Sequence, residues 1–174
     1  EKSPRHITLR QAAELAAATP PFVTLVGLFV NAGAESVRDA LRHVPLDLLQ
    51  FHGDESAEFC EQFSKPYLKA IRVNAGVDLL QCAAHFHTAK GLLLDAHVEG
   101  MPGGTGTTFD WTLIPESMPL PVILSGGLDA ENVAAAIKQV HPYAVDVSSG
   151  VEASKGIKDA AKIARFMQEV KRDV

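Results

Sequence analysis

The sequence has little of what marks several specialised classes of protein. Only two of its 174 residues are cysteine, too few for a disulfide framework. No apolar run approaches the roughly 20 residues of a membrane-spanning helix, and the opening segment EKSPRHITLR is too polar for a signal peptide. Lys and Arg total 16 against 21 Asp and Glu, so no basic surface points to nucleic acid. We therefore expect a cytoplasmic globular protein that binds neither nucleic acid nor membrane.

Six short apolar runs alternate with longer amphipathic segments. The runs cover residues 22–31, 46–53, 67–73, 91–96, 121–127 and 143–150. Continuous hydrophobicity of this kind is typical of parallel strands that are covered on both faces. The pattern predicts an α/β fold of about six strands and seven helices, in a single domain spanning 1–174. An open doubly wound sheet fits this count, whereas a closed (β/α)8 barrel requires eight strands.

Polar residues and glycines follow four of the six predicted strands. In a barrel these strand ends converge on one face, where such folds place their chemistry. Glycine-rich loops after the last two strands can bind a phosphate through backbone N–H groups, although each taken singly is also an ordinary turn. We favour phosphate binding, and the candidate residues are Gly126, Gly127, Ser148, Ser149 and Gly150. Neither GxxxxGK[ST] nor GxGxxG is present, so a sugar phosphate suits the site better than a nucleotide.

Asp95 lies at the end of the apolar run 91–96 and is the main candidate for a catalytic group. A carboxyl group placed there is partly desolvated, which suits a general acid. The glycines of 103–106 would let the next loop bend over a ligand. The alternative is a strand-end acid that meets solvent or caps a neighbouring element.

Two further sets of residues have weaker functional interpretations. His85 and His87 lack the spacing and the additional ligands of a metal site, and we predict no metal. Lys69 is the only lysine that could serve a sugar-phosphate epimerase or lyase, but we expect its segment YLKAIRV to give it no charged neighbour. We expect surface histidines rather than a metal site, and we keep another sugar-phosphate isomerase, epimerase or lyase as an alternative of lower rank.

The sequence resembles the phosphoribosylanthranilate isomerases of tryptophan biosynthesis. The resemblance runs in family order along nearly the whole chain, through the motifs KSPR (2–5), VGLFVN (26–31), QFHGDE (50–55), LLLDA (92–96), GGTGTTFDW (103–111), LSGGLDAENV (124–133), VDVSSGVE (145–152) and KGIKD (155–159).

This resemblance implies a (β/α)8 barrel that converts N-(5-phosphoribosyl)anthranilate to 1-(carboxyphenylamino)-1-deoxyribulose 5-phosphate without a cofactor. Asp95 matches the general acid, and Arg5 matches the arginine that holds the anthranilate carboxylate. Gly126, Gly127, Ser148, Ser149 and Gly150 match the phosphate loops. The resemblance also places His52 and Asp146 on the same face, as substrate-binding residues.

The chain departs from the family pattern at its beginning. The family opens with a strand that carries a cysteine general base, followed by a helix and a second strand, and none of these is in the sequence. Cys60 and Cys82 fall on predicted outer helices and cannot replace that base. We therefore expect an incomplete, N-terminally truncated barrel, with unpaired edges at 22–31 and 143–150 and doubtful activity on its own. The alternative is an inactive phosphate-binding module, and fusion to or association with a neighbouring pathway enzyme is compatible with the sequence.

Overall fold

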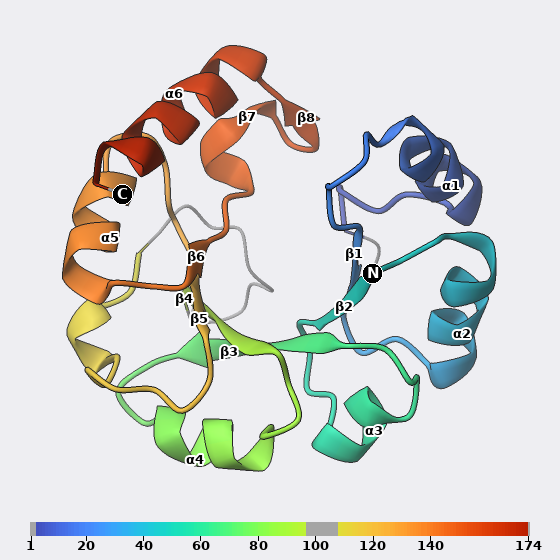
Figure 1. The fold of residues 1–174 in the computed structure, drawn as a ribbon, viewed down its shortest axis with the longest axis horizontal. Coiled ribbons are helices and arrows are strands. Elements are labelled where there is room, and N and C mark those ends of the chain that lie inside the picture. The colour runs from blue at the N-terminus through green and yellow to red at the C-terminus, as the bar shows by residue number, and fades with distance from the viewer. Residues whose placement is uncertain (1–2, 97–107, 174) are drawn as a thin grey trace.

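The computed structural model describes residues 3–96 and 108–173, in which six strands form one parallel sheet (Figure 1). Each strand lies beside the next one along the chain, as successive βαβ units require. The strands are β1 (Val26–Phe29), β2 (Leu48–Phe51), β3 (Tyr67–Val73), β4 (Gly91–Ala96), β5 (Val122–Leu124) and β6 (Ala144–Val145). A separate antiparallel pair follows, β7 (Glu152–Ser154) with β8 (Ile157–Lys158).

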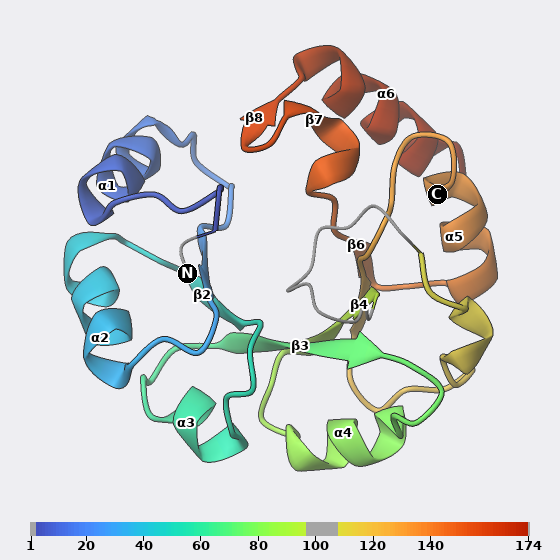
Figure 2. The same cartoon turned by 180° about the vertical axis from the view of Figure 1, so that it is seen from behind.

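The α-helices lie around the outside of the curved sheet (Figures 1 and 2). They are α1 (Leu9–Ala18), α2 (Ala34–His43), α3 (Ala57–Glu61), α4 (Leu79–His85), α5 (Val133–Val140) and α6 (Ala160–Val170), with short 3-10 turns η1 (Trp111–Leu113), η2 (Ser149–Val151) and η3 (Lys171–Asp173). Side chains begin several of them: Thr8 forms a capping box with Gln11, and Asp78 and Asp159 each accept two backbone N–H groups. No helix in the described part of the chain is long and apolar enough to cross a membrane.

The expected count of seven helices is wrong for the described residues, which contain six α-helices. Between β4 and β5 the described chain forms only the 3-10 turn η1. Pro115, Pro119 and Pro121 follow in this segment, and each lacks the backbone donor that a longer helix would use. The predicted strands 67–73 and 91–96 are confirmed as β3 and β4, whereas the run 143–150 forms a strand of only two residues before it turns into η2.

The outer face of the sheet carries the main core. Leu49 and Phe51 of β2 are completely buried among residues of the surrounding helices. The Phe51 ring lies at the centre of an aromatic cluster, with ring centroids 5.8–6.1 Å from those of Phe29, Phe59, Phe63 and Tyr67. Packed aromatic pairs at these distances stabilise the contact between sheet and helices beyond the area they bury.

Strand alternation sends the intervening side chains to the inner face of the sheet. In β4, Leu92 and Leu94 belong to the outer core, so Leu93 and Asp95 point inward. All four are buried, which explains why this strand reads as a continuous apolar run. The inner face is therefore where the acid at the end of β4 lies.

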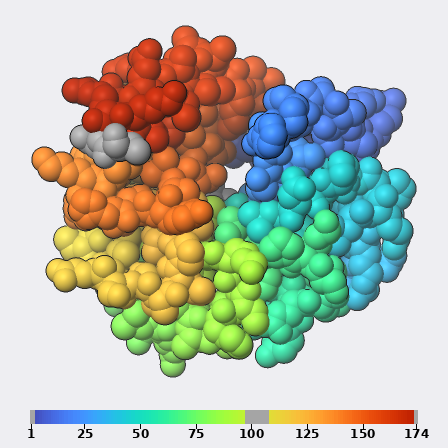
Figure 3. Space-filling model, viewed as in Figure 1, coloured from blue at the N-terminus to red at the C-terminus, as the bar shows by residue number. Residues whose placement is uncertain are grey.

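The sheet is open between β1 and β6, which are its two edge strands in the described structure, as expected for 22–31 and 143–150. In the space-filling view the N-terminal and C-terminal parts face each other across this opening (Figure 3). The inner face of β1 is apolar and accessible, since Leu28 pairs in register with the inward Gln50 and is 56% exposed. An exposed apolar edge strand of this kind favours pairing with another chain.

We expect Leu28→Lys to reduce concentration-dependent self-association, because a charge on an edge strand opposes strand pairing. The stability should change by only about 0.5 kcal/mol, since the side chain is exposed. Light scattering across a concentration series measures the association. Leu80→Lys on α4, where the leucine is 49% exposed and away from the edge, is the control and should leave association unchanged. Equal association by Leu28→Lys and the unchanged protein would contradict the prediction.

Candidate active site at the carboxyl ends of the strands

Asp95 and His52 meet on the inner face of the sheet. The Asp95 carboxylate is buried, with its residue only 5% exposed. One oxygen, Oδ1, accepts the backbone N–H of Ala96 at 2.9 Å, and the other, Oδ2, lies 3.0 Å from His52 Nε2. The structure thus brings together two predicted site residues that are 43 positions apart in the sequence.

The loop after β5 packs directly against Asp95. Gly126 and Gly127 both have positive φ, +83° and +67°, a region that favours glycine. A Cβ atom at Gly126 would lie 2.8 Å from Asp95 Oδ1 and 2.5 Å from the Ala96 nitrogen. Only a residue without a side chain allows this loop to approach the acid so closely.

The loop after β6 packs against the loop after β5. A methyl group at Gly150 would overlap the carbonyl oxygen of Leu128, so the two glycine-containing loops are in contact. Ser148 precedes the 3-10 turn η2, which begins at Ser149. The five predicted phosphate residues therefore lie on two adjoining loops beside Asp95, and their role in binding phosphate stays a prediction.

Asp146 lies at the same strand ends, where its carboxylate forms a hydrogen bond with Ser125. Its Oδ2 accepts the hydroxyl of Ser125 at 2.9 Å, which joins the ends of β5 and β6. The sequence predicts substrate binding for Asp146, and that role stays a prediction; in the structure Asp146 accepts the hydrogen bond of Ser125.

Arg5 is bound to a carboxylate of the chain itself. Its Nε and Nη2 lie 2.7 and 2.8 Å from the two oxygens of Glu152, in the bidentate geometry that Arg prefers. The hydrogen bond from Arg5 lowers the pKa of Glu152 to about 2; burial opposes the shift and Lys158 Nζ, 3.1 Å away, adds to it. The same hydrogen bond raises the pKa of Arg5. Sequence reasoning missed Glu152, which no local pattern connects to Arg5 across 147 residues.

Lys69 has a buried acidic partner, which corrects the expectation drawn from its sequence neighbours. Its Nζ lies 2.9 Å from Glu55 Oε2 and also donates to the carbonyl oxygen of Gly53 at 2.5 Å. Glu55 was missed because it lies in the loop after β2, 14 residues away. The ammonium faces the helices, 5.6 Å from the centre of the Phe86 ring. Lys69 is therefore on the wrong side of the sheet for a Schiff base with a substrate at Asp95.

Glu55 connects the ends of three strands. Besides Lys69 of β3, its carboxylate accepts the backbone N–H groups of Asn31, after β1, and of Gly53, after β2, at 2.7 and 2.8 Å. Burial alone would raise the pKa of Glu55, but the hydrogen bonds from Lys69 and the backbone outweigh it, and the pKa falls below its ordinary value. This buried pair fixes the loop that carries His52.

Both cysteines are placed where a thiolate is disfavoured. Cys60 lies on α3, is completely buried in the outer core, and burial raises the pKa of its thiol to about 11. Cys82 lies on α4, and burial likewise raises the pKa of its thiol. The expectation that both thiols occupy outer helices is confirmed.

The described residues hold no cluster of three His, Cys, Asp or Glu side chains that could bind a metal ion. The predicted lid glycines at 103–106 lie outside the described residues.

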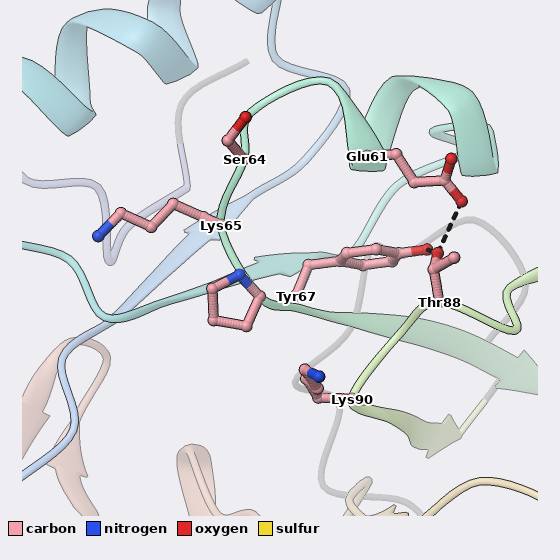
Figure 4. Close-up of a pocket in the computed structure, with 7 residues that line it drawn as sticks. Glu61, Ser64, Lys65, Tyr67, Thr88 and Lys90 are labelled. Atoms are coloured by element: carbon pink, nitrogen blue, oxygen red, sulfur yellow. Dashed lines mark hydrogen bonds between the residues drawn. The ribbon is translucent and has the colours of Figure 1, made fainter.

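A shallow groove lies at the opposite ends of the strands (Figure 4). It has a volume of about 440 Å³ and is lined by Glu61, Ser64, Lys65, Pro66, Tyr67, Thr88 and Lys90. Tyr67 and Lys90 mark the beginnings of β3 and β4, whereas Asp95 lies near the end of β4. The hydroxyls in the groove bond to one another and to Glu61, at 2.7 and 2.6 Å. These two hydrogen bonds join Tyr67, Thr88 and Glu61 to one another, and the groove holds none of the predicted site residues.

Two adjoining glycine loops beside an inward, buried acid, at the carboxyl ends of parallel strands, define an α/β protein of the kind that binds small ligands at that edge. A sequence model of the family described as N-(5'-phosphoribosyl)anthranilate (PRA) isomerase matches residues 1–169. The chain belongs to this family, which confirms the resemblance carried by its motifs.

Individual relatives give the same result. The chain is 63% identical over 171 residues to the N-(5'-phosphoribosyl)anthranilate isomerase of Thiobacillus denitrificans, covering 98% of this chain and 83% of the relative. It is 59% identical over 170 residues to that of Nitrosospira multiformis, covering 98% and 82%.

Solved structures of the family superpose closely. Phosphoribosyl anthranilate isomerase from Thermotoga maritima has a TM-score of 0.87 and 38% identity, covering 98% of this chain and 83% of that one. A structure of the isomerase in complex with reduced 1-(o-carboxyphenylamino)-1-deoxyribulose 5-phosphate has a TM-score of 0.84 and 37% identity, covering 98% and 82%.

We expect Lys69→Met to destabilise the protein by about 3–5 kcal/mol, because it leaves the Glu55 carboxylate buried without its counter-ion. Urea unfolding followed by circular dichroism measures the loss. The double variant Lys69→Met/Glu55→Gln should regain part of it, since no charge then remains. Lys90→Met, at an exposed lysine, is the control and should cost at most about 0.5 kcal/mol. A loss as small as the control's would show that the pair does not hold these strand ends.

The Arg5–Glu152 pair predicts a specific loss of stability in acid. Because the folded state lowers the pKa of Glu152 from 4.5 to about 2, its stabilising contribution is complete above pH 4.5 and disappears as the pH falls toward 2. Glu152→Gln should therefore lower the melting temperature at pH 7. Between pH 4.5 and 2, the melting temperature of this variant should fall by less than that of the unchanged protein. Melting curves at several pH values test this. Glu131→Gln, at an exposed acid 3.8 Å from Arg165, should retain the full acid dependence. Identical pH profiles for Glu152→Gln and the unchanged protein would refute the prediction.

Proposed function

We propose that this chain serves the isomerisation of N-(5-phosphoribosyl)anthranilate to 1-(carboxyphenylamino)-1-deoxyribulose 5-phosphate, an Amadori rearrangement in tryptophan biosynthesis. The observation that carries the proposal is the contact between the inward Asp95 carboxyl group and the Gly126 loop, in a chain that belongs to the PRA isomerase family. A sugar phosphate that spans this contact has its phosphate on the loops and its ring beside the acid.

In this proposal Asp95 is the general acid. It protonates the ring oxygen of the ribose, which opens the ring to a Schiff base, and a base then removes the proton from C2 to give an enolamine that becomes the ketone. The enclosed position of Asp95 at the end of β4 keeps bulk water from competing for the proton. Because the acid and the phosphate loops adjoin, binding of the phosphate positions the sugar for proton transfer.

The phosphate is proposed to bind the backbone N–H groups of Gly126, Gly127, Ser148, Ser149 and Gly150. Support comes from the positive φ of Gly126 and Gly127, since backbone turns of this kind can form an anion-binding concavity.

Arg5 is proposed to hold the anthranilate carboxylate. Its bidentate pair with Glu152 has the geometry that such a carboxylate needs. The substrate would take the place of Glu152, whose charge Lys158 still balances.

Neither thiol suits the role of the base that abstracts the C2 proton. Cys60 and Cys82 lie on outer helices, and burial holds the pKa of each thiol above its usual value, so the reactive thiolate is scarce near neutral pH. For this reason we propose that the chain on its own has low isomerase activity.

The open sheet is proposed to be six of the eight strands of a (β/α)8 barrel, in one domain spanning 1–174. The accessible inner face of β1 and the strand order from β1 to β6 support this architecture. The competing interpretation of a lyase that uses Lys69 is disfavoured, because that ammonium lies on the helix side of the sheet and is paired with Glu55.

Turnover and ligand binding test the proposal together. We expect the 174-residue chain to bind reduced 1-(o-carboxyphenylamino)-1-deoxyribulose 5-phosphate, measured by calorimetry, and to turn over substrate slowly in a fluorescence assay. Asp95→Asn should keep the binding and lower the turnover by about a hundredfold or more, because it removes the proton donor. Cys60→Ala and Cys82→Ala are the controls and should leave turnover unchanged.

Turnover that Asp95→Asn does not lower would reject the role of the acid and favour a phosphate-binding module without activity. Turnover at the rate of a natural isomerase would show that another group of this chain abstracts the proton.

A further inference from the structure

Gln50, His52 and Asp95 form a hydrogen-bonded row along the inner face of the sheet. Gln50 Nε2 lies 3.1 Å from His52 Nδ1, and His52 Nε2 lies 3.0 Å from Asp95 Oδ2. Gln50 is 7% exposed, and the His52 side chain is 15% exposed. Because Gln50 belongs to β2 and precedes His52 by two residues, strand alternation places both on the face that carries Asp95. The row ends on the proposed proton donor.

The atoms of this row determine which nitrogen of His52 carries a proton. The amide nitrogen of Gln50 can only donate, so His52 Nδ1 must be an acceptor and bears no hydrogen. The hydrogen of the neutral ring is then on Nε2, from which it is donated to Asp95 Oδ2. An imidazolium would carry a second N–H at Nδ1, directed at the N–H of Gln50, and this contact is repulsive.

We propose that Gln50 is a positioning residue that keeps His52 neutral, so that Asp95 can carry the proton that it donates. This inference rests on the proposed function of Asp95 as the acid. A positive charge 3.0 Å from Asp95 would favour its ionised form and reduce the fraction able to protonate the substrate. The N–H of a neutral His52 ring still orients Asp95 Oδ2 through a hydrogen bond. It favours the ionised form of Asp95 much less than an imidazolium would.

The charged groups around His52 act on its ring in opposite directions, so we infer that the contact with Gln50 determines its protonation. From β4, Asp95 favours the imidazolium. From β3, Arg72 opposes it, with Nη2 3.5 Å from the carbonyl oxygen of His52. In the loop that follows His52, Asp54 lies 3.9 Å from the guanidinium of Arg72, and the Glu55 carboxylate is paired with Lys69. Asp54 and Glu55, the two acids that follow His52 in this loop, thus each have a cation close to them.

The tautomer can be measured on the unliganded chain by long-range ¹H–¹⁵N correlation of its imidazole rings. The His52 signals are identified by their loss in His52→Gln. We expect a neutral ring protonated at Nε2 at pH 7. Gln50→Glu replaces the donor by an acceptor and should convert His52 to the imidazolium, because a carboxylate accepts the N–H that a doubly protonated ring carries at Nδ1. Gln50→Met keeps a similar shape without a donor and should release the ring to a mixture of tautomers.

Gln62→Glu is the control for the added negative charge, because Gln62 is exposed and bonded to Arg38 on the outer side of the sheet. It should leave the His52 signals unchanged. The proposal is overturned if His52 is protonated at Nδ1 or doubly protonated at pH 7, or if neither Gln50 variant changes its signals. These spectra require no catalysis, so a failure here is distinct from a failure of the Asp95→Asn turnover test, which concerns the proposed function.

Discussion

Side chains along a strand alternate between the two faces of the sheet, and this alternation decides what each polar residue of the protein can do. The outer face is reserved for contact with the helices, and Phe51 with its aromatic neighbours occupies it. The inner face receives every second residue, which includes Gln50 on β2 and Asp95 on β4. A residue one position earlier or later would be buried in the helix layer, out of reach of any ligand.

Charged groups on the two faces consequently have opposite uses. Lys69 is as deeply buried as Asp95, yet it lies on the helix side, where Glu55 neutralises it. That ion pair gathers the ends of β1, β2 and β3 and fixes the turn that carries His52. Among the described residues, no Lys or Arg is bonded to Asp95, which is held by a backbone N–H and an imidazole and so stays open to proton transfer.

The sequence predicted the elements whose signals are local. The apolar runs predicted the first and last residues of β3 and β4 correctly. The order of the motifs along the chain identified the family. The residues missed were those defined by distant partners. The cations paired with Glu55 and Glu152 lie 14 and 147 positions away in the sequence. The periodicity of a sequence does not indicate such contacts. Gln50 could have been predicted, because it lies in β2 two residues before His52, which directly follows the strand, and so shares its face.

The pair between Arg5 and Glu152 also has a consequence for the order of folding. Strands of the main sheet pair with their successors, so most of the sheet can assemble from neighbours along the chain. Joining Arg5 to Glu152 instead requires closure of a loop of 147 residues, whose entropic cost grows with the logarithm of its length. The entropic cost of a contact between such distant residues is smaller once the structure between them has formed and brought them close. The contact between Arg5 and Glu152 is therefore expected to form late, after the strands between them have set the curvature of the sheet.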